Sequence, residues 1–342
     1  MSKNQPSQQA PTDTVTTATP SPGLMDETSV DISVVIPCYS SSEGLEELTS
    51  RLVSTLESMN RRFEVILVND ASPDNGLTWF TISELTETTP HLRGINLQFN
   101  VGQFLATLSG LEESKGQLVA IMDDDLQHAP EDLPTLISML ENEPLDAVLA
   151  NLKSKRHGLF RNFGSKVVGS TFAILHGKPK GLKMSSFAVF KRPVVESMIA
   201  HQTRRPVLNA LVLASTKRIG NKTVEHHSRM HGKSGYTLRR LVRATLDNVF
   251  YATTAPLRAF SYLGALISLT SFCYSGFLLY RWSAYGSTVQ GFTTLAILIS
   301  IFGGLTLLGL GLMGEYIDRI ISETSGRPRW IIADRCNNQG AE

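Results

Sequence analysis

The chain has 342 residues, a formal net charge of +1 and three cysteines. Its length fits two or three domains, and the nearly neutral balance gives no indication of a nucleic-acid partner, since nucleic-acid-binding domains are usually strongly basic. Cys38, Cys273 and Cys336 are far apart in the sequence. They fit free thiols in a reducing compartment better than a disulfide framework.

The first 30 residues are rich in Ser, Thr, Pro and Gln and nearly free of large apolar side chains. Such a segment buries too little apolar surface to offset the entropy lost on ordering, so we expect a disordered tail. The tail has no continuous apolar run of the kind found in a secretory signal.

Short apolar runs then alternate with helical patterns up to about residue 151. We expect strands at residues 32–37, 63–68, 95–98, 118–122 and 147–151. This alternation predicts an α/β domain with a mostly parallel sheet, in which ligands bind beyond the carboxyl ends of the strands. Asp70 and Asn100 fall at two such ends.

The sequence DDDLQH at residues 123–128 directly follows the strand expected at 118–122. Alternation along an extended chain puts Asp123 and Asp125 on one side and Asp124 on the other. Asp123, Asp125 and Gln127 offer hard oxygen ligands suited to Mg²⁺ or Mn²⁺, cations that also bind substrate phosphates. The alternative is a solvated acidic turn, and the position of the run at a strand end favours the metal site.

Two basic segments follow, at residues 153–166 and 229–236. Arg and Lys suit phosphate oxygens, and the glycines of the second segment allow a close approach to a ligand. A solvated face and attraction to anionic lipid headgroups are the alternatives. We favour phosphate binding for the second segment.

Two uncharged runs, residues 259–280 and 283–314, occupy the C-terminal part. Each is long enough to cross a hydrocarbon core of roughly 30 Å as a helix, and a pair of buried core helices is the alternative. Arginines flank the pair on both sides, so the positive-inside rule puts both flanks and the N-terminal domain in the cytoplasm. Residues 237–257 have the apolar spacing of an amphipathic helix at the membrane surface.

The chain resembles family 2 glycosyltransferases, and within them the membrane-bound polyprenyl-phosphate group that includes undecaprenyl-phosphate glucosyl and formamido-arabinose transferases and dolichol-phosphate mannose synthase. The resemblance covers about residues 31–332. Its markers are IPCY at 36–39, VNDAS at 68–72, NVGQ at 100–103, DDDLQHAPE at 123–131, RxxGxSxY at 229–236, TAPLR at 254–258, GEYIDR at 314–319 and GRP at 326–328. Their order, together with two terminal apolar runs, is specific.

The resemblance implies a GT-A fold and an inverting transfer from a nucleotide sugar to polyprenyl (undecaprenyl) phosphate, for cell-envelope glycans. It implies a UDP-sugar rather than a GDP-sugar donor, a multi-pass protein of the bacterial inner membrane, and a homo-tetramer. The domains expected are a tail at 1–30, a GT-A domain at 31–236, an interface helix at 237–257, two transmembrane helices at 258–316 and a cytoplasmic tail at 317–342.

The resemblance also assigns residues to roles. Asp125, Arg229 and Lys233 would act in catalysis, and Asp123, Asp125 and Gln127 would hold Mg²⁺ or Mn²⁺. The substrate-binding set would be Pro37, Tyr39, Glu43, Asp70, Asn100, Gln103, Asp123, Asp124, Arg161, Ser185, Ser186 and Ser234. In this set Asp70 would contact the base, and Arg161 would contact a donor or acceptor phosphate.

The sequence departs from the family pattern near residues 181–190, where an Asp and an Arg are usual and Ser185 and Ser186 stand here. A phosphate acceptor is already anionic and needs no base, so this departure favours a phosphate over an alcohol acceptor. Two alternatives remain. A processive polysaccharide synthase would carry a Gln-x-x-Arg-Trp motif, which is absent, and a non-catalytic scaffold would not need the intact carboxylates of the acidic run.

Overall fold

The computed structural model describes residues 30–152, 177–204, 206–224, 255–285 and 291–337. Within these residues the centre of the molecule is one sheet of eight strands in the order β7-β5-β6-β4-β1-β2-β3-β8. Four of its seven strand pairings are parallel. The prediction of an α/β domain with a mostly parallel sheet is therefore confirmed.

The strands are β1 (Ile32–Cys38), β2 (Phe63–Asn69), β3 (Leu92–Leu97), β4 (Leu118–Ile121), β5 (Ala147–Leu152), β6 (Ala188–Lys191), β7 (Ile219–Val224) and β8 (Ile332–Cys336). The helices are α1 (Ser42–Ser58), α2 (Leu77–Thr88), α3 (Gln103–Glu113), η1 (Pro130–Asp132), α4 (Leu133–Asn142), α6 (Arg192–Ala200), α7 (Leu208–Ser215), α9 (Ala255–Tyr285) and α10 (Phe292–Thr324). The five expected strands are present, and β3 begins three residues earlier than expected.

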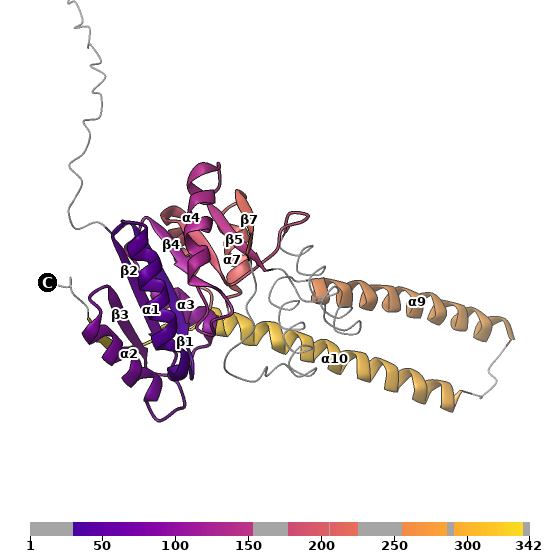
Figure 1. The fold of residues 1–342 in the computed structure, drawn as a ribbon. Helices are drawn as coiled ribbons and strands as arrows, with labels where there is room; N and C mark the ends of the chain where they lie inside the picture. The colour runs from indigo at the N-terminus through magenta and orange to yellow at the C-terminus, as the bar shows by residue number, and fades with distance from the viewer. Residues whose placement is uncertain (1–29, 153–176, 205, 225–254, 286–290, 338–342) are drawn as a thin grey trace, which may run out of the picture.

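Helices cover both faces of the sheet (Figure 1). Alternate residues of β1 point to opposite faces, so Val34 and Ile36 pack with α1, α2 and α4, whereas Val35 packs with α3, α6 and α7. All three side chains are fully buried. The near-continuous apolar character of β1 and β2 follows from this burial on both sides.

Helix α3 lies close to the sheet because of one glycine. A Cβ on Gly110 would come within 2.5 Å of a Val35 side-chain atom and 2.9 Å of a Val68 side-chain atom. Without a side chain at this position, the helix backbone can rest directly on β1 and β2. Gln103, at the N-terminal end of the same helix, lines the cavity described below.

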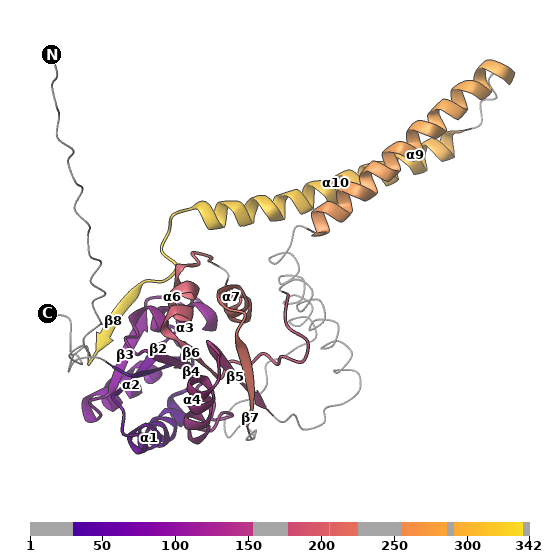
Figure 2. The ribbon, with the colours of Figure 1, turned by 90° about the horizontal axis from the view of Figure 1, so that it is seen from above.

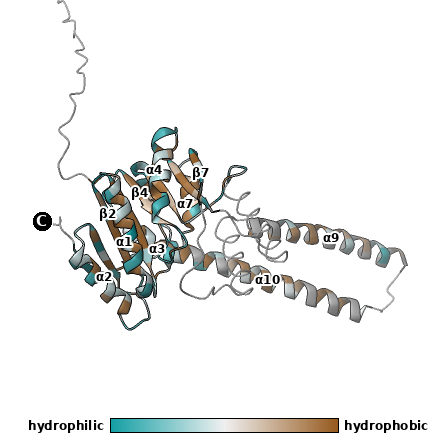
Figure 3. Cartoon of the chain, in the orientation of Figure 1, coloured by the Kyte–Doolittle hydropathy of each residue, from teal (hydrophilic) through white to brown (hydrophobic). Residues whose placement is uncertain are grey.

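Helices α9 and α10 run alongside each other and extend away from the α/β domain (Figures 1 and 2). The ring of Phe260 packs against the bare backbone of Gly309. Many apolar side chains of the pair are exposed, among them Leu269 and Leu307, and the coloured parts of both helices carry brown segments (Figure 3). Among the described residues, no helix combines the length and the apolar character needed to cross a membrane.

Several expectations concern residues outside the described part of the chain. These are the N-terminal tail up to residue 29, the first basic segment with Arg161, the second with Arg229, Lys233 and Ser234, and residues 237–254 of the expected interface helix. They stay predictions.

Candidate active site

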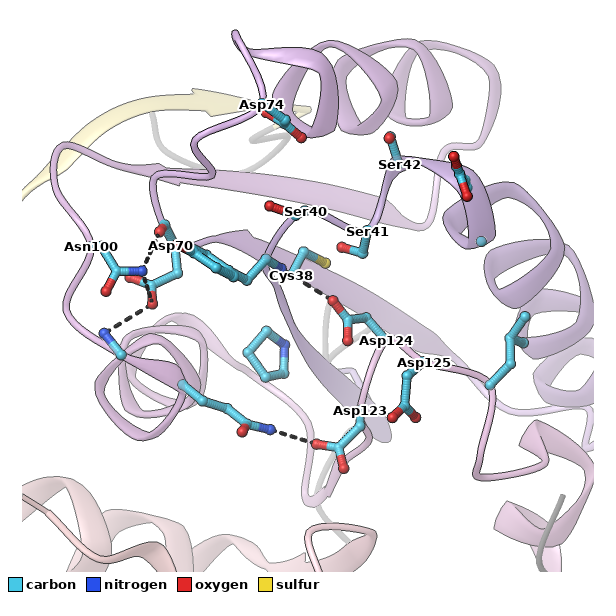
Figure 4. A pocket seen from close by; sticks show the side chains of 17 residues that line it. Cys38, Ser40, Ser41, Ser42, Asp70, Asp74, Asn100, Asp123, Asp124 and Asp125 are labelled. Carbon is cyan, nitrogen blue, oxygen red and sulfur yellow. Dashed lines mark hydrogen bonds between the residues drawn. The ribbon is translucent and has the colours of Figure 1, made fainter. Parts of the chain in front are cut away.

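A cavity of about 770 Å³ opens at the carboxyl ends of β1, β2 and β4. Its walls come from the segments that follow these strands, because the carboxyl ends of parallel strands share one edge of the sheet. The lining includes the predicted residues Pro37, Tyr39, Glu43, Asp70, Asn100, Gln103, Asp123, Asp124 and Asp125. Figure 4 shows the side chains of Asp70, Asp123, Asp124 and Asp125 around this cavity.

Asp70 organises the segment that we call the wall loop, residues 98–103. Its carboxylate accepts hydrogen bonds from the Asn100 side chain (3.0 Å), the Val101 N–H (2.7 Å) and the Gly102 N–H (2.9 Å). Asp70 is only 3% exposed. Burial raises the pKa of its carboxyl, and the N–H groups of Val101 and Gly102 lower it in part. The structure thus gives Asp70 a role in shaping the cavity wall.

Asp123 is held from three sides. The Gln103 side-chain amide donates to its Oδ1 at 2.7 Å, and the Ser186 hydroxyl donates to its Oδ2. The buried ring of His128 lies with Nδ1 3.8 Å from Oδ2 and stacks on Phe187. These contacts join α3, the acidic run and the segment before β6. They orient Asp123 before any ligand arrives.

Asp124 also faces the cavity, although alternation along a strand predicts that it points away from its neighbours. The reason is that β4 ends at Ile121, so the acidic run is not extended. The Tyr39 N–H donates to Asp124 Oδ2 at 3.1 Å. Burial raises the pKa of Asp124 to about 6, the Tyr39 N–H lowers it in part, and the charges of Asp123 and Asp125 raise it further.

Three residues that follow the strands of the cavity have left-handed backbone conformations without being glycine. Ser40, Ala71 and Leu126 have φ angles of 54°, 45° and 57°. Such conformations are costly for residues with a side chain and gather at functional sites. Each follows a different strand of the cavity, so the turns that carry Tyr39, Asp70 and the acidic run are all strained.

Cys38 is among the residues that line the cavity, and it is fully buried. Burial, and then the charge of Asp124, raise the pKa of its thiol well above the usual value. Because the thiolate is the reactive form, this cysteine is unsuited to act as a nucleophile.

Comparison with known proteins identifies the family. Residues 33–199 match the model of glycosyl transferase family 2. Undecaprenyl-phosphate 4-deoxy-4-formamido-L-arabinose transferases of Salmonella choleraesuis and Salmonella agona are each 31% identical over 303 residues, which is 88% of this chain and 92% of the relative. The chain belongs to glycosyl transferase family 2. It is a glycosyltransferase, and the residues that match the family model belong to the α/β domain.

Solved structures give weaker similarities to this glycosyltransferase. Mannosyl-3-phosphoglycerate synthase from Rubrobacter xylanophilus is 17% identical with a TM-score of 0.46, covering 67% of this chain and 74% of that one. Glucosyl-3-phosphoglycerate synthase from Mycobacterium tuberculosis, in complex with Mn²⁺, UDP and glucosyl-3-phosphoglycerate, is 16% identical with a TM-score of 0.45, covering 65% and 78%.

The residues of this glycosyltransferase fit a divalent cation that is bound partly by the protein and partly by a substrate. Among the described residues, no three His, Cys, Asp or Glu side chains are arranged to hold a metal ion by themselves. Asp125 faces the cavity, and its Oδ1 accepts the Gln127 N–H at 3.2 Å. Mg²⁺ is commonly bound by one or two carboxylates together with substrate phosphates, which matches this sparse set of hard oxygen ligands.

Three further predicted residues are described, whereas Arg161, Arg229, Lys233 and Ser234 lie outside the described residues. Ser186 is joined to Asp123, whereas the Ser185 hydroxyl accepts the Phe187 N–H at 3.2 Å, and Gln127 follows the cavity-lining part of the acidic run. The sequence analysis did not single out His128 as a site residue. The sequence feature that could have indicated His128 is its position at the end of the acidic run.

Proposed function

We propose that this glycosyltransferase transfers a sugar from a nucleotide sugar, with UDP as the favoured nucleotide, to undecaprenyl or another polyprenyl phosphate at the cytoplasmic face of the bacterial inner membrane. The main support for this proposal is the similarity to undecaprenyl-phosphate transferases over 88% of the chain and 92% of the relative. That span exceeds the family domain at residues 33–199, so it extends beyond the nucleotide-binding part.

The chemistry proposed is a displacement with inversion at the anomeric carbon. An oxygen of the acceptor phosphate forms a bond to this carbon as the bond to the diphosphate oxygen breaks, and the electron pair leaves with the nucleoside diphosphate. A phosphate monoester is largely ionised near neutral pH, so no protein base has to remove a proton. This agrees with the sequence near Ser185 and Ser186, where the Asp that is usual in the family pattern is missing.

The protein groups would bind and orient the donor. Tyr39, Asp70 and Asn100 would form the nucleotide wall, and Asp123, fixed by Gln103 and Ser186, would face the ribose or diphosphate. Asp125 and Gln127 would hold Mg²⁺ or Mn²⁺, which when bound stabilises charge on the departing diphosphate. Arg229, Lys233, Ser234 and Arg161 would contact phosphates.

The proposal includes attachment to the membrane through α9 and α10. Exposed apolar side chains along both helices support contact with lipid. The uncharged runs at 259–280 and 283–314 support two crossings with the catalytic domain in the cytoplasm. We also propose that the protein forms a homo-oligomer, with a tetramer as the expected form.

A transfer assay tests this function. Full-length protein in detergent is incubated with undecaprenyl phosphate, Mn²⁺ or Mg²⁺ and one radiolabelled UDP- or GDP-sugar at a time. We expect a labelled lipid with one donor, and its loss on adding EDTA. Asp125→Asn should lower turnover by about 100-fold or more.

The matched control is Glu57→Gln, which neutralises an exposed carboxylate on α1 outside the cavity. Normal turnover is expected. A lipid product that forms equally well with Asp125→Asn would contradict the assigned metal site. Failure of every donor to give a product would favour the non-catalytic scaffold.

A further inference from the structure

The segment that follows α10 lies beside the strand that leads into the wall loop. We call residues 329–337 the C-terminal arm. Its strand β8 forms the edge of the sheet and pairs with β3 in antiparallel register, with Ile332 opposite Leu97 and Arg335 opposite Ile95. Figure 2 shows α10 leading into this strand at the edge of the sheet. Strand β3 runs directly into the wall loop, so the arm contacts the element from which that loop emerges.

The arm holds the wall loop at its first residue. The Gln98 N–H donates to the Ile331 carbonyl oxygen at 2.9 Å. Trp330 and Ile332 pack against the core formed between the sheet and α3, α6 and α7, and Val101 of the wall loop packs against the same core. The loop that surrounds the Asp70 carboxylate is therefore fixed on one side by Asp70 and on the other by the arm.

The arm also contacts the far ends of the two elements that the wall loop joins. The Arg335 guanidinium donates to Glu113 Oε1 at 2.9 Å, at the last residue of α3. The Asn337 side chain donates to the Pro90 and Leu92 carbonyl oxygens at 3.1 and 2.7 Å, at the start of β3. The C-terminal arm therefore contacts β3, the wall loop and α3.

The start of the arm is tied to the end of α10. Glu323, in the last turn of α10, accepts hydrogen bonds from the Thr203 hydroxyl (2.9 Å) and the Arg204 N–H (3.3 Å). Only four residues separate α10 from the arm, and the Arg329 guanidinium then donates to the His201 carbonyl oxygen at 3.0 Å. The end of α10 and the start of the arm are therefore both held by residues 201–204.

We propose that the C-terminal arm positions the wall loop for the nucleotide sugar, with Trp330 and Ile332 as positioning residues. This inference rests on the proposed function, since it concerns the donor side of the same site. The loop carries Asn100 and Gln103 on the cavity wall, and its Gly102 has a φ of 89°, a region open mainly to glycine. The hydrogen bonds of the loop to Asp70 and its attachment to the arm together set the geometry that it presents to a ligand.

Two identical truncations at adjacent positions test the role of the arm. Ile332→Ala removes a side chain that packs on the core, whereas Ile331→Ala removes one that is 41% exposed and leaves the carbonyl that Gln98 binds. The full-length protein is titrated with UDP in the presence of Mn²⁺, and steady-state transfer gives kcat and KM for donor and acceptor.

We expect Ile332→Ala to raise the Kd for UDP and the donor KM by about threefold to tenfold, within the range of remote positioning effects. The kcat at saturating donor and the acceptor KM should stay near wild type. Ile331→Ala should match wild type, and Ile332→Val should restore tight binding. Hydrogen exchange without nucleotide should be faster at the Val101 and Gly102 amides only in Ile332→Ala.

Three results would overturn the inference. The first is a UDP Kd within twofold of wild type in folded Ile332→Ala. The second is a change in the acceptor KM of Ile332→Ala as large as the change in its donor KM. The third applies if Ile332→Ala does not fold, and it is unchanged UDP binding and unchanged hydrogen exchange of the wall loop in Trp330→Phe. A wild-type protein that binds neither UDP nor GDP with Mn²⁺ would instead refute the proposed function.

Discussion

Replacing Asp124 by Asn should stabilise the metal-free protein at neutral pH. In the folded protein burial raises the pKa of Asp124 to about 6, whereas an unfolded chain has an Asp pKa of about 3.9. Between these two values the folded state binds more protons than the unfolded state, so this group lowers stability as pH rises from about 4 to about 6. Asparagine removes the charge and can still accept the Tyr39 N–H.

The size of the effect follows from the pKa difference of about two units. Each unit corresponds to about 1.4 kcal/mol, which gives an upper value of about 3 kcal/mol. Asp124 keeps some contact with solvent, so we expect about 1–2 kcal/mol in practice. For a domain of this size that corresponds to a rise in Tm of about 2–8 °C.

Thermal unfolding in EDTA from pH 4 to pH 8 measures this effect. The difference in Tm between Asp124→Asn and wild type should be close to zero at pH 4, grow up to about pH 6 and stay constant above it. Asp334→Asn, which removes an exposed carboxylate on β8, is the control and should give no such profile. A difference that is independent of pH, or an Asp124→Asn protein less stable at pH 7.5, would refute the reasoning.

Four further substitutions test the backbone strain, packing and ion pairs of the α/β domain. Ala71→Gly relieves a left-handed residue and should raise stability by up to about 1 kcal/mol, seen as a higher Tm; a lower Tm would contradict the strain. Gly110→Ala places a Cβ against β1 and should lower stability by about 1–3 kcal/mol in the same assay, whereas an unchanged Tm would mean that α3 shifts freely. Arg93→Ala leaves the buried Glu64 carboxylate without its ion-pair partner and should lower the free energy of unfolding by about 3 kcal/mol. Arg61→Ala breaks an exposed ion pair and should lower it by less than about 1 kcal/mol. Equal losses of stability in the two variants would refute this reasoning.

Strands β1 to β5 could be predicted because each is a mostly apolar run, whereas β6, which pairs between β4 and β5 inside the sheet, was not expected. β1 and β2 are buried at every position, and a run of apolar residues between turn signals is a direct sequence signal. β8 gives no such signal, since only its two ends are partly buried and its middle is exposed. It becomes a strand because β3 offers a free edge, and that partner lies far away in the sequence.

The site could be predicted as a location, since Asp70, Asn100 and the acidic run all follow strands that end at one edge. The contacts between its residues could not. Ser186 donates to Asp123 across 63 positions of sequence, and no periodicity links such a pair. The orientation of Asp124 was missed because the alternation rule applies only while the chain is extended, and β4 ends before the acidic run.

The place of β8 in the chain has a consequence for biosynthesis. The sheet of the catalytic domain is completed by a strand that follows α10, so the edge of β3 stays open while the ribosome is still making both long helices. An open edge strand is a template for pairing with other chains. Until the final strand emerges, the nascent catalytic domain has an unprotected edge, and a chain stalled or cleaved after α10 would keep that edge exposed to aggregation.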